Sequence, residues 1–195
     1  MARRATVAFV ALAAADTLLA AAGRDRRRWL TKPLLMPVLM IGRDRPAQRA
    51  LALGGAGDVA LLGSGETAFT AGLACFLAGH VAWIAALRQR PGGGHLRARP
   101  VLAAPYVTVF GAVNAYLWKR TGKDRLPVAI YSAALLAMSL TALDSGSPRT
   151  AAGGALFLVS DTLLALEKFG GLHLPGHGAL VMATYTSAQA LLAGG

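Results

Sequence analysis

The sequence predicts an all-α membrane protein, a bundle of about eight transmembrane helices, and three observations predict it. First, 55% of the 195 residues are hydrophobic and only 15% are charged, whereas about a quarter of a typical soluble domain is charged. Second, the mean hydropathy is +0.50, and the apolar residues form long blocks separated by short basic joints, as in polytopic helical membrane proteins. Third, the blocks lack the apolar–polar alternation of membrane β-barrels.

Eight apolar segments are expected to form the helices. They are Thr6–Ala22, Trp29–Ile41, Ala47–Leu62, Thr67–Leu87, Val101–Trp118, Leu126–Leu143, Thr150–Leu166 and Gly178–Leu192. Several are shorter than the roughly 20 residues of an average span, so they must include flanking residues or distort. We interpret the first as a retained helix rather than a cleaved signal peptide, because a basic run follows it at once. No linker interrupts the chain, so residues 1–195 are predicted to form a single transmembrane domain.

The net charge of +11 comes mainly from arginines in the joints between segments. Basic residues at such positions anchor helices to anionic headgroups, so we predict contact with the lipid bilayer and no binding of nucleic acid. They divide ten against ten between the two sides, so orientation is not predicted. The single cysteine, Cys75, excludes an internal disulfide. The joint histidines lack the spacing of ligands, so neither a metal site nor a cofactor is predicted.

The segment Trp29–Ile41 contains Pro33 and Pro37, four residues apart. Proline removes a helical hydrogen bond, so this segment is expected to be kinked or partly unwound, with protein or a wet cavity covering the freed backbone groups. Lys32 then either points into that cavity or extends to the membrane interface. The spacing alone leaves both readings open.

Two aspartates lie well inside apolar segments, Asp58 in Ala47–Leu62 and Asp161 in Thr150–Leu166. A buried carboxylate in a membrane helix is costly and normally faces a polar cavity with a partner. Both lie about two-thirds of the way along segments that cross in the same direction, so we predict similar depths and one shared cavity. There, one carboxyl group can act as an acid and the other as a base. The alternative is two separate structural acids.

Further polar residues are candidates for binding a substrate. His80 lies deep in Thr67–Leu87, where it either serves the site or packs between helices, and its depth argues against direct pairing with Asp58. Glu66 follows a turn and also suits a helix N-terminus. The uncharged candidates, which also suit hydrogen bonds between helices, are Asn114, Tyr131, Ser160, Tyr185 and Gln189. Asp16 is similarly ambiguous.

Five motifs occur in order along the chain: Thr31–Pro37, Gly57–Leu62, Phe76–His80, Ser160–Phe169 and Tyr185–Gln189. Together they resemble the YhhN-like family of integral membrane proteins, which includes the lysoplasmalogenases. The resemblance implies an eight-helix fold and hydrolysis of the vinyl ether bond of lysoplasmalogens, with release of a fatty aldehyde and a glycerophospho-base. It also implies that Asp58 and Asp161 occupy the two acidic motif positions. The expected partner is a lysophospholipid, and the expected location is the bacterial inner membrane, in several passes.

This chemistry suits two carboxyl groups without a metal. One donates a proton to the alkene carbon, and the other stabilises the cation and activates water. Our hypothesis makes Asp161 the acid and Asp58 the base, with the reverse assignment open, and lets Lys32 or nearby arginines hold the phosphate. The alternatives are a proton-coupled transporter and a non-catalytic lipid-binding protein. The headgroup preference and the oligomeric state are not predicted.

Overall fold

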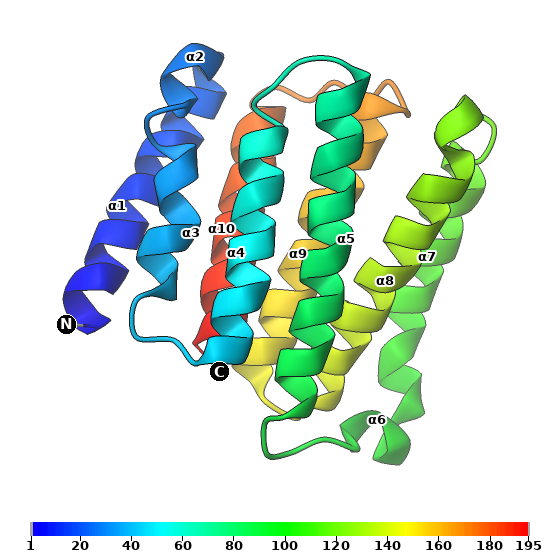
Figure 1. Cartoon of the computed structure of the whole chain (residues 1–195). Helices are drawn as coiled ribbons and strands as arrows, with labels where there is room; N and C mark the ends of the chain where they lie inside the picture. The colour runs from blue at the N-terminus through cyan, green and yellow to red at the C-terminus, as the bar shows by residue number, and fades with distance from the viewer. Residues whose placement is uncertain (1, 195) are drawn as a thin grey trace.

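The computed structural model describes residues 2–194, and all regular structure within them is helical (Figure 1). The longer helices are α1 (Ala2–Ala21), α3 (Lys32–Met40), α4 (Arg45–Ala60), α5 (Glu66–Arg88), α7 (Ala104–Leu117), α8 (Arg125–Asp144), α9 (Pro148–Lys168) and α10 (His177–Ala193). The short ones are α2 (Asp25–Arg28), α6 (His95–Ala98) and the 3-10 turns η1 (Pro100–Ala103) and η2 (Gly122–Asp124). The all-α fold class is confirmed for the described residues, and each predicted apolar segment corresponds to one longer helix.

Within residues 2–194, five stretches are long and apolar enough to cross a bilayer, so the chain is a membrane protein. They are Arg4–Ala21, Glu66–Arg88, Pro100–Leu117, Gly122–Asp144 and Pro148–Lys168. The predicted number of about eight spans is not confirmed, because α3, α4 and α10 have only 9, 16 and 17 residues. At roughly 1.5 Å per residue, α3 is only about 14 Å long.

The helices form a bundle with α1 at one edge and α7 at the other (Figure 1). Neighbouring helices in the bundle pack as follows: α1 contacts α3 and α10, α3 contacts α4, α4 contacts α5, and α5 contacts α8. Helix α9 lies between α8 and α10 and contacts both. Helix α1 begins and α10 ends at one end of the bundle, and the opposite end carries α2 and η2 (Figure 1). We call the latter the α2 end.

Glycines allow α4 and α5 to lie close together beside Asp58. A Cβ atom on Gly57 would lie 2.6 Å from the ring of Phe76 in α5, and one on Gly54 would lie 2.9 Å from Nε2 of Gln189 in α10. Small residues at such positions permit close helix contact in membranes. The glycines that precede Asp58 therefore bring α5 and α10 next to it.

The proline-containing segment is unwound at its start rather than in its middle. Trp29–Thr31 form turns in which the N–H groups of Leu30 and Thr31 donate to carbonyl oxygens three residues earlier. Helix α3 begins only at Lys32, and Pro33 lies in its first turn, where a missing N–H leaves no gap in the helical bonding. Pro37 lies inside the helix. This arrangement makes Lys32 the first helical residue and buries its side chain.

Three arginines, two in connections and one in the first turn of α9, cap the C-terminal end of α10. Arg43 Nη1 donates to the carbonyl of Ala193 at 3.0 Å, and Arg90 Nη1 donates to that of Leu192 at 2.8 Å. Arg149 Nη1 lies 3.4 Å from the carbonyl of Gly194. Cations at a helix C-terminus satisfy its free carbonyl groups and complement its dipole. The three contacts tie the α3–α4 connection, the α5–α6 connection and the start of α9 to the end of α10.

We expect Arg90→Met to lower the free energy of unfolding by about 1.5–3 kcal/mol, the usual contribution of a hydrogen bond from a charged group. The thermal unfolding midpoint of purified protein in detergent measures the effect. Arg88→Met is the matched control, because Arg88 is exposed at the end of α5. Equal midpoints for the two variants would show that the contact with Leu192 does not stabilise the bundle.

Candidate functional site

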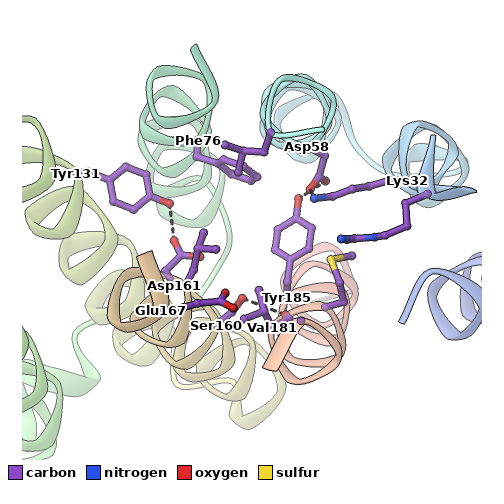
Figure 2. Close-up of a pocket in the computed structure, with 14 residues that line it drawn as sticks. Lys32, Asp58, Phe76, Tyr131, Ser160, Asp161, Glu167, Val181 and Tyr185 are labelled. Atoms are coloured by element: carbon purple, nitrogen blue, oxygen red, sulfur yellow. Dashed lines mark hydrogen bonds and ion pairs between the residues drawn. The ribbon is translucent and has the colours of Figure 1, made fainter. Parts of the chain in front are cut away.

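Asp58 of α4 and Asp161 of α9 line one pocket of about 190 Å³, which Arg28 at the end of α2 also lines (Figure 2). The other polar residues that line it are Arg28, Lys32, Tyr131, Ser160, Glu167 and Tyr185. Apolar walls come from Leu61, Phe76, Leu164, Val181 and Met182. The two carboxylates come from opposite walls, with Lys32 and Tyr185 beside Asp58 and Tyr131 beside Asp161 (Figure 2).

The Asp58 carboxylate is buried and has a cationic partner. Lys32 Nζ lies 3.3 Å from Oδ1, and the hydroxyl of Tyr185 donates to Oδ2 at 2.7 Å. Gln189 Nε2 donates to the Tyr185 oxygen at 3.2 Å, and Trp83 Nε1 donates to Gln189 Oε1 at 3.1 Å. The ammonium group favours the ionised form of this carboxylate, and the hydrogen-bonded chain fixes its position from behind.

The Asp161 carboxylate has uncharged or titratable neighbours instead. The hydroxyl of Tyr131 donates to its Oδ2, and His80 Nε2 lies 3.6 Å from the same oxygen, beyond hydrogen-bond length. The buried His80 ring packs edge-on against Tyr131 and Phe157. Among the described residues, no lysine or arginine lies within ion-pair distance of Asp161. The pocket thus holds two carboxyl groups in different electrostatic settings.

An apolar groove continues from the pocket on the Asp161 side. It shares Tyr131, Asp161 and three apolar residues with the pocket and extends between α5, α8 and α9. The residues lining only the groove include Phe69, Leu73, Val128 and Phe169. Asp58 does not line this groove. Asp161 therefore lies at the junction of a polar and an apolar space, whereas Asp58 faces the polar space.

The structure brings most, but not all, of the predicted site residues together. Lys32, Tyr131, Ser160 and Tyr185 line the pocket with both aspartates. His80 and Gln189 lie directly behind Asp161 and Tyr185. Ser160 uses its hydroxyl to donate to the carbonyl of Val181 at 3.1 Å, so its main contact joins α9 to α10.

Glu66 and Asn114 do not line this pocket, although Asn114 lines a smaller cavity next to Tyr131 and Asp161. Glu66 is exposed at the start of α5, where its carboxylate pairs with Lys123 of η2. Asn114 donates to the carbonyl of Phe110 at 2.9 Å and accepts from Ser132 at 2.9 Å, so it bonds within α7 and to α8. Glu66 thus lies at a helix N-terminus and Asn114 forms a hydrogen bond between helices, which are the structural roles that the sequence left open for them.

Arg28 and Glu167 line the pocket but were missed as site residues. Arg28 belongs to the basic run in the first joint, which the sequence pattern assigned to contacts with lipid headgroups. It precedes Lys32 by four residues, and Glu167 follows Ser160 by seven, which are spacings that share a helix face. That periodicity was the available signal. Helix α2 ends at Arg28, so only the turn geometry seen in the structure shows that the two cations face one pocket.

No group of three or more histidine, cysteine, aspartate or glutamate side chains within the described residues is arranged to hold a metal ion. The side chains that line the pocket can transfer protons between carboxyl groups, hydroxyls and water, and Arg28 and Lys32 can bind an anion.

Comparison with known proteins gives one finding. Residues 27–195 match the YhhN family. Neither the curated proteins nor the solved structures gave a match. The matched range contains both aspartates and every residue that lines the pocket, whereas α1 lies outside it.

Proposed function

Since the chain belongs to the YhhN family, we propose that it is an integral membrane hydrolase that cleaves the vinyl ether bond of lysoplasmalogens to a fatty aldehyde and a glycerophospho-base. One observation carries the proposal: two carboxylates from different helices line a single pocket that continues into an apolar groove. In this proposal α3, α4 and α10, which pack against the five longer spans, also lie in the bilayer and bring the number of transmembrane helices to eight.

The shape of the cavity supports one direction for the substrate. The alkenyl chain enters the apolar groove past Phe69, and the glycerol phosphate occupies the polar pocket near Arg28 and Lys32. The alkene carbon within the chain then lies on the Asp161 side. The carbon bonded to the ether oxygen lies nearer Asp58. This placement makes Asp161 the acid and Asp58 the base, in agreement with the different neighbours of the two carboxylates.

The reaction then proceeds in balanced steps. Protonated Asp161 gives its proton to the alkene carbon of the chain, and the double-bond electrons form the new C–H bond. The neighbouring carbon becomes an oxocarbenium ion, which the Asp58 carboxylate stabilises. Water loses a proton to Asp58 and adds to that carbon, which gives a hemiacetal.

Breakdown of the hemiacetal restores both acids. Asp58 gives its proton to the glycerol oxygen as the C–O bond breaks, and the hemiacetal hydroxyl gives its proton to Asp161. The products are the aldehyde and the glycerophospho-base. Lys32 compensates the charge of the Asp58 carboxylate in this cycle, and Tyr131 orients Asp161 through its hydroxyl.

A lysolipid panel tests the reaction class. Purified protein in detergent is given lysolipids that carry the same headgroup and a vinyl ether, saturated ether or ester chain, and aldehyde and free fatty acid are measured. We expect aldehyde from the vinyl ether alone, because only that bond forms a stabilised cation on protonation. The control is the Asp58→Asn/Asp161→Asn double variant. Fatty acid from the ester would indicate acyl hydrolysis instead, and no product from any lipid would remove the hydrolase proposal.

Proton-coupled transport is the second candidate, and one observation favours it. Asp161 lies beside the buried His80, whose Nε2 is 3.6 Å from Asp161 Oδ2, and Asp58 lines the same pocket. Aspartate, glutamate and histidine side chains that lie close together inside a membrane bundle also serve proton relays. Aldehyde release in detergent, without any gradient, separates the two functions, because a transporter has no product to release under those conditions.

A further inference from the structure

Helix α1 carries a buried aspartate on the face that packs against α3 and α10. It lies at the edge of the bundle, and only Phe9 and Asp16 are buried among its residues 4–21 (Figure 1). Asp16 is completely inaccessible to solvent. A carboxylate is an expensive way to pack a membrane helix against its neighbours, since an apolar residue packs without the cost of dehydration. Its contacts therefore indicate a role other than packing.

Those contacts are with residues that shape the pocket. Arg28 Nη2 donates to Asp16 Oδ2 at 3.1 Å, and Arg28 Nε lies 3.4 Å from both carboxylate oxygens. The hydroxyl of Thr31 donates to Oδ1 at 2.7 Å. Thr31 directly precedes Lys32, whose ammonium group pairs with Asp58. The Asp16 carboxylate thus binds both the guanidinium of Arg28 and the hydroxyl of Thr31, the residue before α3.

The contact leaves part of the guanidinium free for a ligand. Asp16 uses Nε and Nη2 of Arg28, and Nη1 has Asp25 as its partner at 3.5 Å. The Asp25 side chain is 81% exposed and lies three residues earlier in the chain. Such an exposed pair is weak, so a phosphate oxygen can replace it. The side chain of Arg28 itself is only 14% exposed and lines the pocket.

We propose that Asp16 is a positioning residue that orients Arg28 and, through Thr31, Lys32, so that both cations face the phosphate of a lysophospholipid in the pocket. The inference rests on the proposed function for the identity of the lipid. It gives α1, which lies outside the range matched to the family, a part in substrate recognition.

The test measures binding without turnover, so it does not depend on catalysis. The probes are a saturated 1-O-alkyl lysophospholipid and the matching 1-O-alkylglycerol, which lacks the phosphate. The ligand-dependent rise in the thermal unfolding midpoint gives the affinity of each variant for each probe. Asp16→Asn keeps the shape and an acceptor oxygen for Thr31 but loses the charge that holds Arg28. We expect the phosphate probe to bind about tenfold more weakly, because one charge-assisted contact is lost. Binding of the alkylglycerol should be unchanged, because it has no phosphate.

Three further variants separate positioning from a structural role. Arg28→Met should weaken binding of the phosphate probe similarly, and adding Asp16→Asn to it should have no further effect, because the two residues act as one unit. Asp16→Glu should restore part of the selectivity for phosphate. Equal loss of both probes in Asp16→Asn, or additive effects in the double variant, would show that Asp16 only fastens α1 to the bundle. A wild-type protein that binds the phosphate probe but releases no aldehyde would overturn the hydrolase and leave this inference standing.

Discussion

Replacing Asp161 with asparagine is expected to lower kcat for vinyl ether cleavage by about 10²–10⁴-fold, the usual contribution of a general acid. Asparagine cannot deliver a proton to the alkene carbon, although its side-chain oxygen still accepts the hydrogen bond from Tyr131. Its volume is nearly that of aspartate, and no lysine or arginine is left unpaired. The substitution should therefore remove the chemistry without removing the fold. Aldehyde release by purified protein measures the rate.

The matched control is Asp124→Asn, which makes the same change in η2, away from the pocket. Its rate should stay within about twofold of wild type, as expected for a residue that does not line the site. Binding of a saturated ether lysolipid should be nearly unchanged in Asp161→Asn, because the residue acts in the transition state rather than in holding the substrate. Undiminished aldehyde release from this variant would remove Asp161 from the mechanism.

The fold class was predictable because hydropathy acts over whole helices. Long apolar blocks bounded by arginines correspond one to one with the longer helices, with ends displaced by a few residues. The lengths of the helices were less predictable. Ala47–Leu62 and Gly178–Leu192 form helices too short to meet the requirement for a span, because hydropathy does not report where the backbone turns. The start of α3 shows the same limit, since Trp29–Thr31 are apolar enough for a helix but form turns.

Part of the site could be predicted because burying a charged side chain in a membrane helix is costly. Asp58, Asp161 and Lys32 were identifiable because ionisable residues inside apolar segments need partners. The partners of these residues were not predictable, since the sequence pattern does not show which helices are neighbours. His80 lies beside Asp161 rather than Asp58 because its ring packs against Tyr131 of α8 and Phe157 of α9, the helix that carries Asp161. Arg28 was hidden for a different reason: the first joint has four arginines, and only the turn after α2 selects one of them.

Replacing Asp58 with asparagine is expected to have two effects, one on stability and one on rate. The Lys32–Asp58 pair is buried, with side-chain exposures of 9% and 2%. Removing one partner of a buried ion pair typically costs about 3–5 kcal/mol, because the other charge is left without compensation. The thermal unfolding midpoint should fall accordingly. The rate of aldehyde release should fall by about 100-fold or more, because no base remains to activate water.

The double variant Asp58→Asn/Lys32→Met separates these effects. Methionine fills much of the space of the lysine stem and leaves no buried ammonium, so the unfolding midpoint should recover most of the loss. The rate should not recover, since the missing carboxylate is the base. If stability and rate recovered together, the carboxylate would serve only to neutralise Lys32, and the water would need no base. Because Lys32 is also proposed to face the phosphate, kcat is compared at saturating lipid with that of Lys32→Met alone. Recovered stability with a kcat well below that of Lys32→Met therefore assigns the chemical role to Asp58 itself, since the two variants share the loss of Lys32.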